Sequence, residues 1–281
     1  MRIFLTGATG YIGNAVAFSL RERDHDVAAL VRAGADGGPL RARGVVVMTG
    51  DLASLRSIAG TLSEYDAYIH CASSATPDAV ALDRTAVDVF TSAPGYFLYT
   101  SGVWVLGNSA NGTRADEETP VNPLKLVAWR AAHEQAVLRS GKNSVLRPGI
   151  VYGGRQSICA QWFAAADQTR PIEIAGEGSN HWPMVEVSEL AQLYARAVEQ
   201  KPTGVLHGVD DTDATVAECA RALGPDVVSK PAEGAYGEAV SSNQIVSSEK
   251  TRRKLGWNPQ KTFTSTVDEQ RREWRSALQR A

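Results

Sequence analysis

Cysteine is scarce in this chain of 281 residues, and the three that occur, Cys71, Cys159 and Cys219, lie far apart. An odd number of widely separated cysteines without a CxxC pair argues against a disulfide framework and a cysteine-based zinc site. It indicates free thiols in a reducing cytosol. Because no other residue types show metal-ligand spacing, we expect no metal site.

The chain also lacks an excess of one charge and a long apolar run. Its 29 lysines and arginines nearly balance its 31 acidic residues, and the net charge of −2 argues against a nucleic-acid binder. Met1-Arg2 leads straight into an apolar strand without a signal-peptide core, and no apolar run is long enough to span a bilayer. We expect a cytoplasmic protein that acts on a small molecule and contacts neither nucleic acid nor membrane.

A glycine-rich turn, TGATGYIG at residues 6–13, follows the first apolar strand and opens a helix. Its glycines are spaced three apart, which permits a tight turn, a close backbone approach to a pyrophosphate, and close packing of helix on strand. The start of the helix would then present backbone N–H groups to the phosphates. The sequence therefore predicts a dinucleotide site at Gly7, Thr9, Gly10, Tyr11, Ile12 and Gly13.

Apolar strands and helical stretches alternate through the first half. We expect strands at 3–6, 27–31, 45–49, 67–71, 96–100 and 145–147, and helices at 11–23, 54–62, 78–91 and 124–140. Strands that are apolar along their length belong to a parallel sheet covered on both faces. The pattern predicts an α/β protein with a doubly wound parallel sheet, the Rossmann fold.

The second half is less regular. Residues 152–186 are rich in loops around a short helix at 160–167, and further helices are expected at 188–200, 213–223, 247–255 and 263–278, with a strand at 205–208. We expect a dinucleotide-binding Rossmann domain at 1–151. Residues 152–281 would form a small C-terminal substrate lobe and return in part to the Rossmann core.

Several short motifs, in this order and spacing, resemble the extended short-chain dehydrogenase/reductase superfamily of NAD(P)-dependent epimerase/dehydratase-like proteins. Besides the glycine turn they are GDL at 50–52, LYTSG at 98–102, LRPGIVYG at 146–153, the segment 182–190 and KLGWNP at 254–259. The resemblance covers nearly the whole chain. It implies further cofactor contacts at Asp51, Leu52, Cys71, Ala72, Thr100, Pro148, Gly149, Ile150 and Val151.

The residues that carry proton transfer in this superfamily are replaced. Its usual acid is a tyrosine with a lysine four residues later, and these two positions fall on Leu126 and Arg130. None of the eight tyrosines has a lysine four residues later. The serine or threonine that holds the substrate oxygen falls on Gly102, with Ser101 beside it.

These replacements remove the ordinary proton source. Reducing a carbonyl requires a hydride and a proton, and a leucine has no proton to give. Arg130 could hold the nicotinamide ribose, but it is a very poor acid. The candidates for the proton are Lys125, an ordered water, or the substrate itself.

Each candidate catalytic residue also has a simpler interpretation. Lys125 lies roughly 100° around the helix from Leu126, so it can equally be a solvated surface residue. Ser101 either orients a substrate oxygen or satisfies backbone groups. The lone histidines His133 and His181 are interpreted as packing or surface residues.

The end of the second strand bears on the choice of cofactor. An acidic residue there usually binds the ribose 2′-hydroxyl of NAD, whereas arginine accommodates the 2′-phosphate of NADP. This chain has Arg32 and no acid until Asp36. We therefore expect NADP, with NAD less favoured.

Aromatic residues dominate the segments expected near the substrate. They favour a planar or apolar substrate over a nucleotide-sugar, although packing in the core is an alternative for about half of the tryptophans. The predicted substrate contacts are Gly102, Trp104, Trp129, Tyr152, Trp162 and Trp182.

The sequence as a whole predicts an NADP-dependent oxidoreductase that acts on a small apolar or aromatic carbonyl or imine-type substrate. One alternative is a catalytically retired NADP-binding sensor or partner-binding protein. A third hypothesis is a nucleotide-sugar epimerase or dehydratase. A homodimer through the fourth and fifth crossover helices is compatible with the resemblance.

Overall fold

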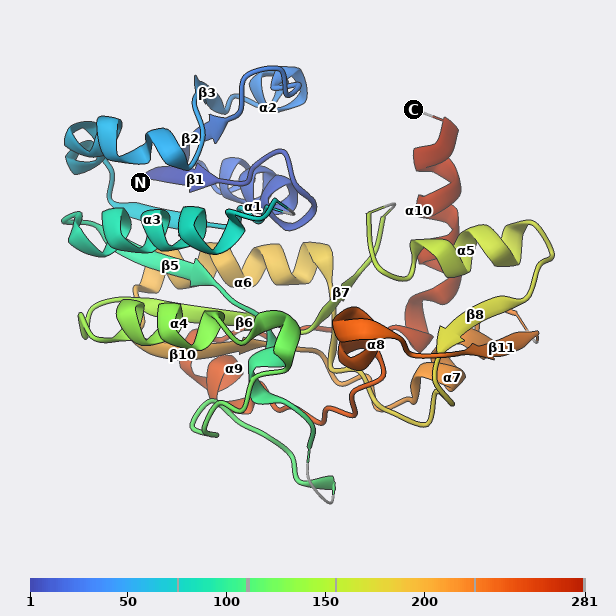
Figure 1. Cartoon of the computed structure of the whole chain (residues 1–281). Coiled ribbons are helices and arrows are strands. Elements are labelled where there is room, and N and C mark those ends of the chain that lie inside the picture. Colours follow the sequence, from blue (N-terminus) through green and yellow to red (C-terminus); the bar gives the residue numbers. More distant parts are fainter. Residues whose placement is uncertain (75, 110–111, 155, 225, 280–281) are drawn as a thin grey trace. The chain divides into compact units, whose positions relative to one another are not determined.

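Parallel strands form the central sheet. The computed structural model describes residues 1–74, 76–109, 112–154, 156–224 and 226–279, and seven strands lie in the order β10-β6-β5-β4-β1-β2-β3 (Figure 1). They are β1 (Arg2–Thr6), β2 (Asp26–Val31), β3 (Val46–Thr49), β4 (Ala67–His70), β5 (Tyr96–Thr100), β6 (Ser144–Pro148) and β10 (Gly204–Gly208). The pairings from β3 across to β6 are all parallel.

The strand order reverses at β1. The chain adds β2 and β3 on one side of β1, and then places β4, β5 and β6 on its other side. This arrangement confirms the doubly wound α/β fold. In such sheets ligands bind beyond the carboxyl ends of the strands beside the reversal, which here lies between β1 and β4.

Helices cover the sheet, so the residues of its inner strands β1, β4, β5 and β6 are mostly buried. α3 (Ala79–Ser92) and α4 (Arg130–Leu138) lie side by side (Figure 1). The Phe90 ring of α3 packs on Phe4, Tyr68 and Phe97 of the sheet, with ring centroids 6.0, 5.4 and 5.2 Å away. Such aromatic contacts fix α3 on the strands. No helix of the described residues is long and apolar enough to cross a membrane.

Helix α1 (Tyr11–Glu22) can lie against β1 only because two glycines meet there. A Cβ on Gly13 would lie 2.1 Å from the carbonyl oxygen of Gly7, which is far inside van der Waals contact. The third glycine of the turn therefore allows the close packing of helix on strand that its spacing predicts.

The chain divides into two compact units. Unit 1 contains residues 1–101, 129–146 and 191–206, and unit 2 contains residues 102–128, 147–190 and 207–281. Residues 102–128, which we expected in the Rossmann domain, thus group with the second half. Most of α6 (Val187–Gln200) belongs to unit 1, so the chain does return to the sheet.

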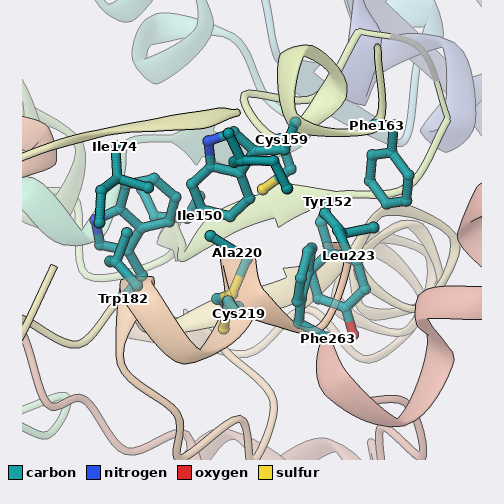
Figure 2. Packing of buried hydrophobic residues seen from close by; sticks show 14 of the residues in the cluster. Ile150, Tyr152, Cys159, Phe163, Ile174, Trp182, Cys219, Ala220, Leu223 and Phe263 are labelled. Atoms are coloured by element: carbon teal, nitrogen blue, oxygen red, sulfur yellow. The ribbon is translucent and has the colours of Figure 1, made fainter. Parts of the chain in front are cut away.

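Unit 2 has an aromatic core of its own. Its shorter elements are β7 (Ile150–Tyr152), α5 (Ala160–Asp167), β8 (Ile172–Ala175), β9 (Met184–Glu186), α7 (Val216–Arg221), β11 (Val227–Lys230), α8 (Gly234–Val240), α9 (Glu249–Leu255) and α10 (Val267–Gln279). Figure 2 shows buried residues from several of these elements pointing toward one another. The indoles of Trp162 and Trp182 stack with centroids 5.4 Å apart and an interplanar angle of 4°.

Some local structure differs from the prediction. The segment expected as a helix at 54–62 is the 3₁₀ helix η1 (Ala53–Glu64). In it the hydroxyl groups of Ser57, Thr61 and Ser63 donate to the carbonyl groups three residues earlier, which suits the tighter winding.

The predicted helix at 124–140 is broken. One 3₁₀ turn, η4 (Lys125–Val127), precedes α4. Strands β8 and β9 lie in the stretch expected as loops, and β11 and α8 were also not predicted. Each is short, so it offers little periodicity to detect.

We expect Gly13→Ala to lower the free energy of unfolding by about 2 kcal/mol, because the added methyl group must push α1 away from the Gly7 carbonyl. Gly60→Ala is the matched control, since a Cβ on Gly60 in η1 meets no atom within 4 Å. Urea unfolding followed by circular dichroism measures both. A Gly13→Ala protein as stable as the control would contradict this account of how α1 is held.

Candidate functional site

The turn between β1 and α1 lies against the residues that follow β4. Gly7 has a φ of +83°, and a Cβ on it would lie 2.5 Å from the backbone nitrogen of Ala72. Gly10 is the N-cap of α1, and its N–H donates to the carbonyl of Gly7 at 2.9 Å. The first turn of this fully described helix has no acidic residue, so its positive end favours an anion.

A pocket of about 410 Å³ opens at this turn, and we call it the glycine-turn pocket. Its volume lies within the range of about 300–1,000 Å³ that is usual for small-molecule and cofactor sites. Its lining residues come from the loops after β1, β2, β3 and β4 and from the start of α3, all within unit 1. The pocket therefore lies where the strand order reverses.

Eight of the predicted cofactor residues line this pocket. They are Gly7, Thr9, Gly10, Arg32, Asp51, Leu52, Cys71 and Ala72. Tyr11, Ile12 and Gly13 form the first turn of α1 and are not in the lining. Thr100 and Arg130 lie elsewhere in unit 1 and are described below.

Several other residues that line the glycine-turn pocket were not predicted from the sequence. The additional lining residues include Leu30, Gly50, Ser73, Ser74, Thr76, Asp78 and Leu82. Most of them follow β4 directly, and a loop at a strand's carboxyl end beside the reversal is an expected site wall. That position in the topology is the signal that would have found them.

Arg32 and Asp51 differ in how they are held. Asp51 accepts a hydrogen bond from the backbone N–H of Ser54 at 2.9 Å, which fixes its carboxylate at the start of η1. Arg32 is exposed, and its guanidinium has no hydrogen bond or ion pair among the described residues. Asp36, the nearest acid in sequence, accepts from the N–H of Gly38 at 2.8 Å and is not part of the pocket lining.

The segment at 148–151 belongs to unit 2. Gly149 donates to the carbonyl of Gly208 at 2.9 Å, and Ile150 donates to that of Pro183 at 2.7 Å. Pro148 ends β6, and Val151 lies in β7. The contact of these four residues with a cofactor stays a prediction.

Arg130, at the position that the sequence predicts for the superfamily's lysine, is anchored in unit 1. Its Nη1 donates to the hydroxyl of Tyr99 at 3.1 Å and to the carbonyl of Thr100 at 3.0 Å. Its guanidinium also lies over the ring of Trp129, 4.5 Å from the centroid. No partner of its Nε or Nη2 is found in the described part of the chain.

Hydroxyl groups connect Arg130's neighbours to the pocket wall. The Thr100 hydroxyl contacts the Tyr194 hydroxyl at 2.7 Å and the Cys71 thiol at 3.3 Å. Burial raises the pKa of the Cys71 thiol to about 11, so it stays protonated at neutral pH. Ser101 Oγ is buried and lacks a hydrogen-bond partner among the described residues, which leaves it able to bind a ligand.

Lys125 and Leu126 are both at the surface of unit 2. The side chain of Lys125 is 81% exposed, and its ammonium lies 3.4 Å from a carboxylate oxygen of Glu238. Leu126 is 38% exposed and offers no polar atom. Lys125 thus lacks, within its own unit, the desolvation that tunes a lysine for proton transfer.

The predicted substrate residues have different surroundings. Tyr152, Trp162 and Trp182 are buried in the core of unit 2, and Trp182 also lines a pocket there. Their contact with a substrate stays a prediction. Trp104 packs against the same core, and its buried indole nitrogen lacks a partner in the described part of the chain. At Gly102 an added Cβ would meet open space, so this position leaves room.

The two histidines are held by hydrogen bonds. The Nδ1 atom of His133, in unit 1, lies 2.8 Å from a carboxylate oxygen of Asp83. His181, in unit 2, contacts the side chain of Asn243 at 3.2 Å. Among the described residues no group of three or more His, Cys, Asp or Glu side chains is arranged to hold a metal ion.

A second pocket, of about 240 Å³, lies within unit 2 and is lined in part by Asp210. This aspartate is 7% exposed, accepts from the Tyr152 hydroxyl at 2.9 Å, and accepts from the N–H of Thr212 at 2.7 Å. Burial raises the pKa of Asp210 to about 6, although these hydrogen bonds oppose the shift.

Comparisons with known proteins agree on the type of protein. The sequence model of the NAD dependent epimerase/dehydratase family matches residues 3–208. An uncharacterised protein of Schizosaccharomyces pombe is 28% identical, over 92% of this chain and 95% of its own length. A 2-alkyl-3-oxoalkanoate reductase of Stenotrophomonas maltophilia is 26% identical, over 73% of this chain and 67% of its own length.

Solved structures share the fold. The UDP-glucose 4-epimerase of Thermotoga maritima, in complex with UDP-glucose, superimposes with a TM-score of 0.86 over 99% of this chain and 100% of that one. The two sequences are 18% identical, so this likeness shows the fold alone.

The buried Asp210 predicts a dependence of stability on pH. Its pKa in the folded protein, about 6, exceeds the ordinary value of 3.8, so the carboxyl's contribution is full below pH 4 and is lost as the pH rises through 6. The Asp210→Asn protein should not lose this stability as the pH rises. We therefore expect its free energy of unfolding, minus that of the wild type, to increase by roughly 2–3 kcal/mol between pH 4 and pH 8.

Urea unfolding at the two pH values measures this difference. The matched control is Asp211→Asn, because Asp211 is exposed and paired with Arg252 at 2.7 Å. A difference between wild type and Asp210→Asn that does not change with pH would refute the prediction.

Proposed function

Because this chain belongs to the NAD dependent epimerase/dehydratase family, we propose that it is an NADP-dependent oxidoreductase. It transfers hydride to or from a small apolar or aromatic carbonyl or imine-type substrate, without a tyrosine–lysine pair. The observation that carries the proposal is the pocket in which the glycine turn, Arg32 and Asp51 meet.

The residues of this pocket fit a dinucleotide. Glycine at positions 7 and 13 leaves the backbone of the turn bare, and a side chain at either would collide with neighbouring backbone. Gly7, Thr9 and Gly10 would hold the pyrophosphate at the start of α1. Leu52 and Asp51 would contact the adenosine end.

The preference for NADP rests on the free guanidinium of Arg32. Arginine binds a phosphate with two parallel hydrogen bonds, and the Arg32 guanidinium makes no ion pair among the described residues. The wall has no carboxylate at the end of β2 that would accept from a 2′-hydroxyl and repel a 2′-phosphate, since Asp36 lies outside the pocket lining.

The superfamily's lysine assists proton transfer by the tyrosine and holds the nicotinamide ribose, and Arg130 takes over the second of these roles. Tyr99 and Thr100 hold its Nη1, and the remaining donors of the guanidinium would hold the nicotinamide ribose. When bound, the nicotinamide supplies or accepts the hydride. Arg130 stays charged throughout and therefore acts by binding and orientation.

The proton comes from an ordered water or from the substrate itself. Leu126 has no proton to give, and Lys125 is exposed and paired with Glu238. A cationic imine needs no protein acid, because the hydride alone gives a neutral amine. Ser101, whose hydroxyl has no partner among the described residues, would orient a polar atom of the substrate.

An apolar substrate is supported by the indole of Trp129 beside Arg130 and by one relative. Trp129 packs edge-on against His133 with centroids 5.1 Å apart, in the same helical segment as Arg130. The 2-alkyl-3-oxoalkanoate reductase that resembles this chain is, by its name, a reductase of an alkyl-substituted oxo acid.

Two other functions remain as alternatives. Loss of the tyrosine–lysine pair with retention of the pocket also suits an NADP-binding sensor or partner-binding protein. The fold shared with UDP-glucose 4-epimerase favours a nucleotide-sugar epimerase or dehydratase, but that chemistry would need the same missing proton-transfer groups.

We expect Arg32→Ala to weaken NADP binding about 10–100-fold and to leave NAD binding within about twofold, because only NADP carries the 2′-phosphate. Isothermal titration calorimetry with both nucleotides measures this. Arg43→Ala, which removes an arginine that packs on Phe18, is the matched control. If Arg32→Ala weakened the affinity for NADP and for NAD equally, the preference for NADP would be contradicted.

We expect turnover of NADPH with at least one member of a panel of apolar aldehydes, ketones and imines, and a loss of tenfold or more in kcat/KM in Arg130→Ala. Lys125→Ala tests the alternative proton source, since abolished turnover in this variant would assign the proton to Lys125. Micromolar NADP binding without turnover on any member would favour the sensor. Absorbance at 340 nm follows the reaction.

A further inference from the structure

A chain of buried polar side chains runs under the carboxyl ends of β1, β4 and β5 and reaches Arg130. Thr6 and His70 lie in contact at 2.6 Å, and the opposite nitrogen of His70 lies 3.4 Å from Asp83. Asp83 accepts from Tyr99 at 2.9 Å, and Tyr99 accepts from Arg130 at 3.1 Å. All five residues belong to unit 1.

Asp83 is the centre of this chain. It lies on α3, contacts Tyr99 of β5 and His133 of α4, and is 5% exposed. One carboxylate oxygen accepts from both Tyr99 and His133, and the other faces His70. Burial raises the pKa of Asp83, but the hydrogen bond from His133, the nearby His70 imidazole and the charge of Arg130 outweigh it and hold the pKa well below its usual value.

An ionised carboxylate fixes the direction of every hydrogen bond around it. A carboxylate only accepts, so the Tyr99 hydroxyl must donate to Asp83 and His133 must carry its proton on Nδ1. The phenol oxygen of Tyr99 then has its lone pairs available for Arg130. Without the carboxylate, the Tyr99 hydroxyl group could rotate so that its hydrogen points toward Arg130, and its oxygen would then no longer accept from the guanidinium.

The stability of the fold does not by itself require a buried, ionised Asp83 that is linked to Arg130 through Tyr99. Burying an ionised group costs free energy that its partners repay only in part, and apolar residues of similar size often serve the fold equally well. His133 already donates a hydrogen bond to the Asp83 carboxylate, so Asp83 would have a partner without Tyr99. The link through Tyr99 adds a fixed position for Arg130, whose own side chain is only half-buried.

We propose that Asp83 is a positioning residue for cofactor binding, which acts through the Tyr99 hydroxyl to hold the Arg130 guanidinium at the end of β5. This inference rests on the proposed ribose-holding role of Arg130. It adds a second layer to that site, made of residues from α3 and β5 that do not themselves line the glycine-turn pocket.

The first experiment observes Arg130 without any cofactor. In arginine-labelled ¹⁵N protein, a guanidinium held by fixed acceptors gives separate Nη resonances, because rotation about its Nε–Cζ bond is slow. Arg130→Lys identifies the signals. We expect Tyr99→Phe and Asp83→Asn to merge or broaden them.

Tyr68→Phe is the matched control. Tyr68 is buried on the neighbouring strand β4, and its hydroxyl donates to the carbonyl of Leu62 at 2.8 Å without contacting Arg130. Its loss should leave the Arg130 signals unchanged. Tyr99→Phe keeps Asp83 and both histidines in place, so it serves the test even where Asp83→Asn folds poorly.

The second experiment measures NADPH dissociation constants by nicotinamide fluorescence. We expect Tyr99→Phe and Asp83→Asn to weaken NADPH binding about three- to tenfold in the wild-type background, and less than twofold in the Arg130→Ala background. A purely structural role would give the same loss in both backgrounds. Adenosine 2′,5′-bisphosphate, which lacks the nicotinamide ribose, should bind all variants equally.

The outcomes separate this inference from the proposed function. Arg130 resonances that are unchanged in Tyr99→Phe would overturn the positioning role, whatever the cofactor does. Equal losses with and without Arg130 would overturn it as well. Resonances that merge while Arg130→Ala binds NADPH like the wild type would support positioning and refute the ribose-holding role of Arg130.

Discussion

The Gly7 carbonyl oxygen lies so near the backbone of Gly13 that a Cβ there would stand 2.1 Å from it. Helix α1 therefore approaches β1 more closely than any side chain would allow. This approach brings the start of the helix to the carboxyl ends of β1 and β4, where the strand order reverses. The dipole of the helix, the bare turn and the loop after β4 then converge on one pocket. The nucleotide-binding character of unit 1 follows from this contact between two backbones.

The segment predicted to carry the superfamily's tyrosine and lysine has its own set of polar contacts. Arg130, at the position predicted for the lysine, donates a hydrogen bond to the hydroxyl of Tyr99 on β5. Beneath them lies a carboxylate that stays ionised although it is buried, because two histidines and Arg130 stabilise its charge. Polar side chains and a backbone carbonyl thus hold Arg130 near the end of β5.

The sequence was sufficient for the fold and for much of the pocket. Long apolar strands and the spacing of Gly7, Gly10 and Gly13 predict the sheet and its turn, since they reflect local geometry. Arg32 and Asp51 line the pocket because each follows a strand whose position in the sheet is predictable. The short strands of unit 2 and the 3₁₀ winding of η1 were not predictable, since a few residues carry too little periodicity.

The buried network shows a different limit of sequence reasoning. His70, Asp83, Tyr99 and His133 come from four elements, and only Tyr99 stands in a motif, the LYTSG segment at 98–102. His133 was interpreted as an ordinary packing residue, and it is indeed buried, but only the fold reveals that it shares one carboxylate oxygen with Tyr99. Similarly, the sequence predicts Trp162 and Trp182 as substrate contacts, but it does not predict that their indoles stack on each other in the core of unit 2.

The two units differ in how they absorb and emit ultraviolet light. Five of the six tryptophans belong to unit 2, among them the nearly parallel pair Trp162 and Trp182. Unit 1 has a single indole, that of Trp129, and the Arg130 guanidinium lies 4.5 Å from its ring centroid. A chain with its other indoles replaced by phenylalanine would therefore carry a native optical probe beside Arg130. Coupling between the stacked pair would report independently on whether the core of unit 2 is intact.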